Sequence, residues 1–183
     1  ATSTATVSVS VTAVNDPPVA VGDTLTTNED QPVSIAATNL LVNDSDVDSA
    51  LSVTAAGAPQ TNGTATLSAG VVTFTPTANF NGTGSFTYTV SDGTSSVTAV
   101  VTVTVVPVND PPVAVNDAKS TGEDTPITFP ATDLSANDTD VDTGDTRTVA
   151  SVGTPNNGTA TLSGGNVTYT PAANFAGTDT FTY

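Results

Sequence analysis

The chain is strongly acidic: eighteen Asp and Glu residues stand against Lys119 and Arg147, a formal net charge of −16 over 183 residues. Such a surface repels nucleic-acid phosphates and anionic lipids, so we expect no nucleic-acid partner and no membrane insertion. Histidine and cysteine are absent, which removes the usual general base, the strongest nucleophile, disulfides and thiolate metal sites. The many Ser and Thr hydroxyls therefore lack a base to activate them, and we predict that the chain is not an enzyme.

Residues 1–13 open the chain with a strand pattern. Val7, Val9 and Val11 alternate with hydroxyl side chains, which is typical of a half-buried β-strand. The same alternation recurs at residues 101–105, immediately before a connector. We therefore interpret residues 1–13 as the closing strand of a preceding repeat.

A connector with the sequence VNDPPVA occurs at residues 14–20 and again at residues 108–114. Adjacent prolines fix φ near −65° and hold the preceding residue extended, so each copy is a stiff link. The repetition divides the chain into a complete repeat at residues 14–107 and a second repeat at residues 108–183 that lacks its last strand.

Within the first repeat, the pattern of apolar residues and turn signals predicts a series of short strands. They are expected at residues 19–25, 31–41, 51–54, 64–68, 71–75, 86–90 and 97–106, and the second repeat follows the same order. Short strands separated by turn signals about every ten residues are typical of a sandwich. We therefore predict an all-β protein of tandem cadherin- or immunoglobulin-like antiparallel β-sandwiches in an elongated array.

Each repeat also carries an acidic loop, NDSDVD at residues 43–48 and NDTDVD at residues 137–142. Two unit charges about 6 Å apart repel by roughly 3 kcal/mol at an effective dielectric near 20, so converging carboxylates favour a bound cation. Oxygen ligands without His or Cys favour Ca²⁺ over Mg²⁺; the alternative is an acidic turn that binds only water. The candidate ligands are Asp44, Asp46 and Asp48 in the first loop and Asp138, Asp140 and Asp142 in the second.

Neither acidic loop is an EF-hand. That loop requires Gly at its sixth position and Glu at its twelfth. Counting from Asp44 gives Ser49 and Ala55, and counting from Asp138 gives Thr143 and Val149. Any cation site here must therefore be of another kind.

Six motifs follow one another in the same order in both repeats: the connector, a Glu-Asp pair, the acidic loop, Asn-Gly-Thr, Phe/Tyr-Thr-Pro-x-x-Asn-Phe and Phe-Thr-Tyr. In this order and spacing they resemble the bacterial cadherin-like tandem repeats of large secreted adhesins, over nearly the whole chain. The resemblance implies a cadherin-type sandwich, an extracellular or cell-surface location and Ca²⁺ as the cofactor between consecutive modules.

The resemblance also implies how the acidic residues are shared among three junctions. The middle junction would use Glu29, Asp30, Asn109, Asp110, Asp138, Asp140 and Asp142. The N-terminal junction would use Asn15, Asp16, Asp44, Asp46, Asp48 and Asp92. The C-terminal junction would use Glu123, Asp124 and Asp179, although the counterpart of Asp179 in the first repeat is Gly84.

The function expected from these features is that of a Ca²⁺-stabilised extender in a long extracellular adhesin or fibre. Its partners would be adjacent repeats or further copies of the chain, joined head to tail, with Val7, Val9 and Val11 donated as a strand to an incomplete second repeat. The alternative is a Ca²⁺-dependent module that binds cell-surface or extracellular polysaccharide.

Overall fold

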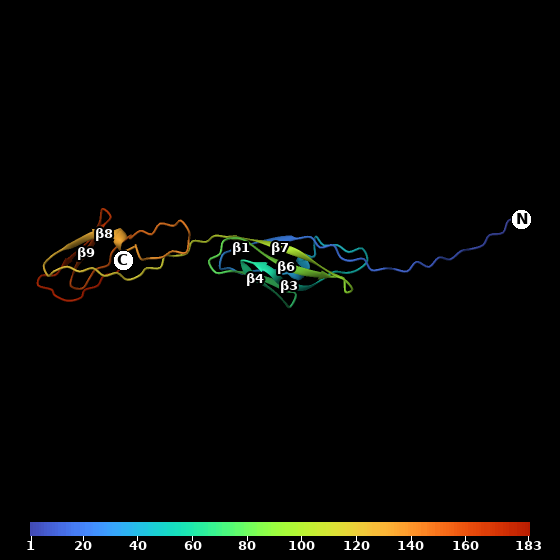
Figure 1. The fold of residues 1–183 in the computed structure, drawn as a ribbon, viewed down its shortest axis with the longest axis horizontal. Helices are drawn as coiled ribbons and strands as arrows, with labels where there is room; N and C mark the ends of the chain where they lie inside the picture. Colours follow the sequence, from blue (N-terminus) through green and yellow to red (C-terminus); the bar gives the residue numbers. More distant parts are fainter. The chain divides into compact units, whose positions relative to one another are not determined.

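The computed structural model describes all 183 residues and contains two compact units, Ala1–Val108 (unit 1) and Asn109–Tyr183 (unit 2). Nearly all regular structure in both units is β-strand (Figure 1). No helix is long and apolar enough to cross a lipid bilayer. The prediction of an all-β fold built from sandwich repeats is confirmed.

Unit 1 is a sandwich of two sheets. One sheet has the strand order β1-β7-β6-β3 and the other has the order β2-β5-β4. The elements are β1 Asp23–Asn28, β2 Val33–Ala36, α1 Ala37–Leu40, β3 Ser52–Thr61, β4 Gly63–Ser68, β5 Val71–Pro76, β6 Gly82–Ser91 and β7 Ser96–Val106.

The core of unit 1 lies between these sheets and follows the period-two pattern of the sequence. Along β7, Val101, Val103 and Val105 are at most 2% exposed, while the residues between them face solvent. The stacked rings of Phe74 on β5 and Phe86 on β6, with centroids 5.8 Å apart, join the two sheets. Burial of each such side chain contributes about 1.5–3 kcal/mol.

Unit 1 differs from the predicted elements in several places; β3 and β6, for example, are both longer than the predicted strands at residues 51–54 and 86–90. The first strand begins at Asp23 and not at residue 19, because Val19 bridges to Ser45 and the N–H of Val21 donates to Asp44 Oδ1. This strand runs parallel to β7, so the sandwich is not wholly antiparallel. The extended segment predicted through residue 41 is also wrong, because residues Ala37–Leu40 form a single helical turn that buries Leu40.

Unit 2 contains one sheet, with the order β8-β10-β9. Its elements are β8 Ile127–Pro130, the 3-10 turn η1 Ala131–Asp133, β9 Gly158–Ser163 and β10 Asn166–Pro171. They repeat the β2-β5-β4 sheet of unit 1. Residues 117–122 and 177–183, which correspond to β1 and most of β6, form no strands. Both β1 and β6 pair with β7 in unit 1, and unit 2 has no strand corresponding to β7.

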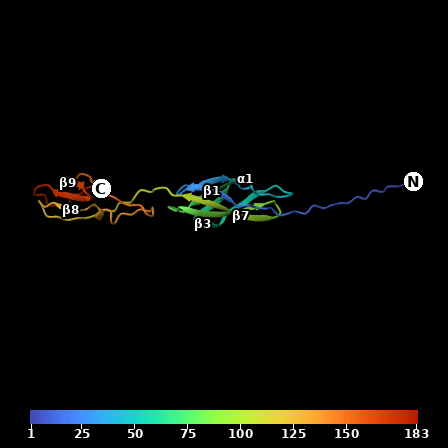
Figure 2. The ribbon, with the colours of Figure 1, turned by 90° about the horizontal axis from the view of Figure 1, so that it is seen from above.

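Residues 1–18 contain no strand (Figure 2). Val7, Val9 and Val11 are 85%, 80% and 88% exposed. Residues 1–13 pair with no segment of this chain, and their assignment as the closing strand of a preceding repeat stays a prediction.

Candidate cation site

The connector of unit 1 lies against the acidic loop and against the turn between β6 and β7. The backbone N–H of Asp16 donates to Asp48 Oδ2 at 3.2 Å. The side-chain amide of Asn15 donates to Asp92 Oδ2 at 2.9 Å. The structure therefore brings together, at one end of unit 1, most of the residues predicted for the N-terminal junction.

Asp46 has one carboxylate oxygen with hydrogen-bond partners and one without. Its Oδ1 accepts from the backbone N–H groups of Asp48 at 2.9 Å and Ser49 at 2.8 Å. These bonds, that from Asp48 first, lower the pKa of Asp46, while the nearby Asp92 carboxylate acts to raise it. Its Oδ2 is buried and has no hydrogen-bond partner. Leaving a buried acceptor unsatisfied is unfavourable, and a cation would relieve it.

Asp92 holds the turn between β6 and β7. Its Oδ1 accepts from the backbone N–H groups of Thr94 and Ser95, each at 2.6 Å. The N–H of Ser95, then the Asn15 amide, then the N–H of Thr94 lower the pKa of Asp92. Asp92 is therefore charged over the whole physiological range of pH.

Unit 2 repeats the contact between connector and loop. The backbone N–H of Asp110 donates to Asp142 Oδ2 at 2.6 Å. The N–H of Asp142 donates to Asp140 Oδ1 at 3.0 Å, and the side-chain amide of Asn109 donates to the Asp110 carbonyl at 2.8 Å. The four residues lie as Asn15, Asp16, Asp46 and Asp48 do in unit 1.

The first aspartate of each acidic loop has a different environment. Asp44 Oδ1 accepts from the N–H of Val21 at 2.7 Å, and both carboxylate oxygens lie 3.2 Å from the Tyr88 hydroxyl. Asp138 Oδ1 likewise accepts from the N–H of Val115 at 2.8 Å and lies 3.0 Å from the Tyr183 hydroxyl. Asp44 and Asp138 thus each bind a backbone N–H and a tyrosine hydroxyl of their own unit. Sequence spacing alone had grouped them with the other loop aspartates as cation ligands.

The sequence analysis did not include Tyr88 and Tyr183 among the candidate site residues, although each ends the Phe-Thr-Tyr motif of its repeat. Tyr88 is fully buried, yet its hydroxyl is also within reach of the carbonyls of Val21 and Leu40. In unit 2 the Tyr183 hydroxyl also contacts Asp117 Oδ2 at 3.0 Å. The signal that could have revealed this is an aspartate at the same place in both repeats, Asp23 and Asp117.

Each hydroxyl lies in an environment with more acceptors than protons, since a hydroxyl donates only one hydrogen bond. Burial, followed by the neighbouring aspartates, raises the pKa of Tyr88 and of Tyr183. Burial also raises the pKa of Asp23, opposed by the Tyr88 hydroxyl and supported by the Asp44 carboxylate. The tyrosines therefore remain protonated donors at any physiological pH.

The Glu-Asp pairs predicted as ligands take part in backbone hydrogen bonds. Glu29 is 3% exposed and its Oε1 accepts from the N–H of Val108 at 2.5 Å. Asp30 has a left-handed backbone, φ 57°, and accepts from the N–H of Asn79 at 2.9 Å. In unit 2, Asp124 has φ 56° and accepts from the N–H of Asn174 at 2.8 Å, while Glu123 is exposed.

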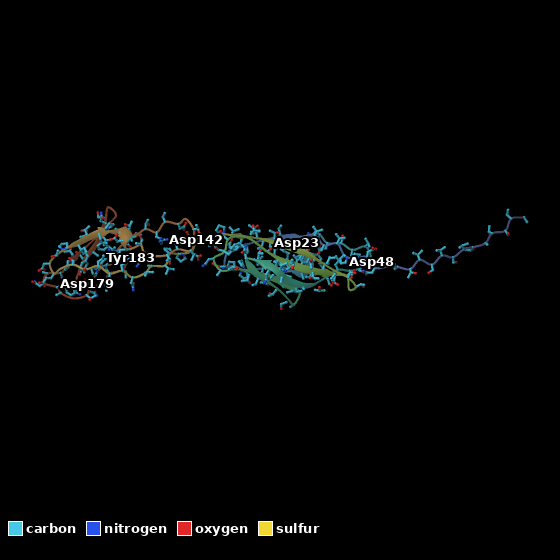
Figure 3. The ribbon with its side chains drawn as sticks, in the orientation of Figure 1. Asp23, Asp48, Asp142, Asp179 and Tyr183 are labelled. Carbon is cyan, nitrogen blue, oxygen red and sulfur yellow. The ribbon has the colours of Figure 1, made fainter.

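Asp179 organises a loop at the other end of unit 2 from Asp142, with Tyr183 between them (Figure 3). It accepts from the N–H groups of Asn156 and Asn157 and from the Tyr169 hydroxyl, at 3.2, 2.9 and 3.0 Å. Burial acts to raise the pKa of Asp179, but these donors and its neighbour's N–H lower it overall.

In unit 1 the residues that correspond to Tyr169 and Asp179 are Phe74 and Gly84. A Cβ atom on Gly84 would lie only 2.9 Å from Phe74 Cζ and 3.2 Å from the Thr61 carbonyl oxygen. Unit 1 therefore has neither the hydroxyl that an aspartate would bind nor the space for it. The exchange is a coupled one, Tyr169 with Asp179 in one repeat and Phe74 with Gly84 in the other.

The donor set fits a hard cation in chemistry: it consists of carboxylate, amide and carbonyl oxygens, and Asp46 Oδ2 is buried without a partner. The structure does not, however, gather three or more acidic side chains into one ready-made metal-binding group. The ligands predicted from sequence are thus brought near one another in pairs, and a cation would have to draw them closer.

A family model described as "Bacterial Ig domain" matches residues 15–104 and, a second time, residues 109–183. The chain belongs to this bacterial Ig domain family. Bacterial Ig domains are non-catalytic modules and typically occur in surface or extracellular proteins. The prediction of bacterial Ig- or cadherin-like tandem repeats is thereby confirmed. The search of curated proteins finds no match.

Solved structures give weaker likenesses. An endo-fucoidan hydrolase of glycoside hydrolase family 107, MfFcnA4, is 21% identical with a TM-score of 0.36, and the alignment covers 90% of this chain but 26% of the hydrolase. Its H294Q variant gives a TM-score of 0.35 at the same identity and coverage. A chimeric titin Z1Z2 carrying an exogenous decorin peptide is 11% identical with a TM-score of 0.25, covering 89% of this chain and 85% of the titin chain.

Proposed function

We propose that this pair of bacterial Ig domains is a non-enzymatic extender of a long extracellular adhesin or fibre, stabilised by Ca²⁺ at its acidic loops. The observation that carries the proposal is the contact between connector and loop that occurs in both units. The amide of Asp16 meets Asp48, and the amide of Asp110 meets Asp142. A cation bound beside these contacts would fix the direction in which each connector enters its module.

The proposed ligands within each unit are oxygen donors at that contact. In unit 1 they are Asp46, Asp48 and Asp92, with Asn15 and Asp16 from the connector. In unit 2 they are Asp140 and Asp142, with Asn109 and Asp110. Bound Ca²⁺ would supply the positive charge that a chain of net charge −16 lacks at these places. Chelation would then expose the loop carboxylates to their mutual repulsion.

The alternative function, Ca²⁺-dependent binding of polysaccharide, has less support. Aromatic faces commonly carry sugar contacts on a protein surface, and the chain has no Trp. Phe74, Phe86 and Tyr88 are fully buried in the core of unit 1. These observations favour the extender over the sugar-binding module.

The test is thermal unfolding of the whole chain with millimolar Ca²⁺, with Mg²⁺ and with chelator. A ligand present at a hundredfold excess over Kd adds about 2.7 kcal/mol, which corresponds to roughly 10–20 °C for a domain of this size. We expect Ca²⁺ to raise Tm and Mg²⁺ to raise it much less. Identical melting curves in Ca²⁺ and in chelator would overturn the proposal.

A matched pair of variants locates the effect. Asp46→Asn should abolish most of the Ca²⁺-dependent rise in the Tm of unit 1, because it removes charge from the oxygen that is buried without a partner. Asp145→Asn removes one charge from an exposed position outside the proposed ligand set and should leave the rise unchanged. Equal losses in the two variants would mean that Ca²⁺ acts only by screening the net charge.

A further inference from the structure

Unit 1 joins its first and last strands directly to each other. β1 and β7 run parallel and pair from Asp23 opposite Val101 to Asn28 opposite Val106 (Figure 1). The connector at residues 14–20 leads into β1, and the connector at residues 108–114 leaves from β7. Tension applied through the two connectors therefore pulls β1 and β7 in opposite directions along their length.

Such a pull is a shear load, which all the hydrogen bonds between the two strands bear at once. In an antiparallel hairpin such as β6 and β7, a pull on the two free ends would open the paired residues one after another. The rate of forced unfolding is set by the barrier to unfolding, so bonds that must break together slow it more than bonds that break in turn. The parallel pair is therefore the part of unit 1 on which tension along the chain acts most directly.

Glu29 extends this pairing beyond the end of β1. Its backbone N–H donates to the Val106 carbonyl at 2.9 Å, and its Oε1 accepts from the N–H of Val108 at 2.5 Å. Glu29 thus holds the chain on both sides of Pro107, a residue that has no N–H of its own to pair. The residue is buried, so water competes little for this charged hydrogen bond.

We propose that Glu29 is a mechanical latch, which fastens the start of the outgoing connector to the end of β1 and keeps β1 and β7 paired under tension. Its bond to Val108 is the first that tension from the C-terminal side meets, because unit 2 begins at Asn109. While this bond holds, Val106 and the residues before it cannot be drawn away from β1 one at a time. The inference rests on the proposed extender function, since an extender transmits tension.

The latch is a different role for Glu29 from the cation ligand that the resemblance implies. A latch needs an oxygen that accepts a hydrogen bond, whereas a carboxylate holds a cation mainly through its negative charge. The ligands proposed for Ca²⁺ in unit 1 lie at residues 15–16, 46–48 and 92, outside the turn between β1 and β2. The latch should therefore act equally in Ca²⁺ and in chelator, and its failure can be distinguished from failure of the proposed Ca²⁺ stabilisation.

Single-molecule force spectroscopy of the whole chain, held by its two ends in chelator, tests the proposal. Unfolding of unit 1 is recognised by the longer stretch of chain that it releases. Glu29→Ala removes the acceptor and should raise the rate at which unit 1 unfolds at constant force by about tenfold or more. Glu29→Gln keeps a neutral acceptor, which is about half as strong, and should raise the rate only about threefold.

Two results of this experiment would overturn the proposal. One is a Glu29→Ala chain that unfolds at the rate of the parent. The other is an effect of Glu29→Ala that appears in Ca²⁺ and is absent in chelator, because Glu29 would then act as a cation ligand.

The direction of the pull separates a latch from a general stabiliser of the fold. Since the chain has no cysteine, Ser34→Cys and Thr66→Cys supply handles at exposed positions of the other sheet, where both lie opposite Thr73 on β5. Tension between these handles runs across β2, β5 and β4 and does not shear β1 against β7. Glu29→Ala should then leave the unfolding rate nearly unchanged. An equal effect in both directions would show that Glu29 only stabilises the fold, and the latch would be refuted.

Discussion

Tyr88→Phe tests the hydroxyl that joins the acidic loop to the core of unit 1. The substitution keeps the fully buried ring and removes one oxygen with its proton. That oxygen lies 3.0 Å from the Val21 carbonyl, 3.2 Å from the Leu40 carbonyl and 3.2 Å from each oxygen of Asp44. The hydroxyl donates one hydrogen bond, and Asp44 Oδ1 also accepts from the N–H of Val21, so the variant removes one donor from this cluster of acceptors.

Removal of one partner from a buried hydrogen bond costs about 1–3 kcal/mol. For a domain of about 100 residues each kcal/mol lowers the midpoint by about 4–8 °C, so we expect a fall of about 8–16 °C for a loss near 2 kcal/mol. The control is Thr104→Val, which also removes one hydroxyl from the same sheet but at an exposed position. It should change the free energy of unfolding by no more than about 0.5 kcal/mol.

The loss of stability caused by Tyr88→Phe should depend on pH. The pKa of Asp23 is raised by burial, and the Tyr88 hydroxyl counteracts that rise. Without the hydroxyl the folded-state pKa of Asp23 climbs further above its unfolded value, near 3.9. A raised carboxyl pKa contributes stability that is present below the unfolded value and is lost as pH rises through the folded one. The variant should therefore recover relative to the parent as pH falls from 7 towards 4.

The assay is hydrogen exchange of the amides in β6 and β7, combined with thermal unfolding by circular dichroism. Exchange reports unit 1 alone, so a change in unit 2 cannot be mistaken for the effect. A loss below about 0.5 kcal/mol, or a loss that is the same at pH 7 and pH 4.5, would refute the reasoning that the hydroxyl donates to a buried acceptor and counteracts the raised pKa of Asp23.

Two other predictions follow from contacts in the two repeats. Tyr169→Phe and Asp179→Gly should each lower the Tm of unit 2. In a double-mutant cycle, the double variant should lose less stability than the sum of the two single losses, and additive losses would contradict a direct interaction between the two side chains. Gly63→Ala should destabilise unit 1 by about 1–3 kcal/mol in urea titration, because its Cβ would lie 2.3 Å from Phe74 Cζ. Gly122→Ala, with its nearest neighbour 3.6 Å away, is the control.

Local patterns in the sequence were sufficient for much of the fold. The hairpin expected at residues 64–68 and 71–75 agrees with β4 and β5 to within a residue, because Ala69 and Gly70 take up the left-handed turn between them, with φ of 48° and 75°. The alternation along β7 likewise identified its buried valines. Such features depend only on neighbours in the chain.

Non-local pairing could not be derived in the same way. The parallel pairing of β1 with β7 joins residues nearly eighty positions apart and leaves no trace in the periodicity of either strand. The helical turn at residues Ala37–Leu40 forms because Leu40 is drawn into the core, which overrides the extended pattern around it. Tertiary packing, and not local preference, decides both.

In the candidate site, too, the sequence predicted local features but not non-local contacts. Spacing alone made Asp44, Asp46 and Asp48 equivalent, since all three alternate along one loop. The structure separates them because Asp44 reaches the N–H of Val21 and the Tyr88 hydroxyl, whereas Asp48 reaches the connector. A sequence can indicate which side chains carry charge, but their partners come from segments that only the fold brings near.

The coupled exchange at positions 74 and 84 has a consequence for folding fidelity. Neighbouring repeats with nearly the same sequence are prone to misfold by exchanging strands while the chain is being made. A hybrid module that brought Asp179 against Phe74 would bury a carboxylate beside a ring that offers no hydroxyl. The opposite hybrid would leave Tyr169 without its acceptor. The two coupled differences between the repeats thus disfavour a module assembled from strands of both repeats.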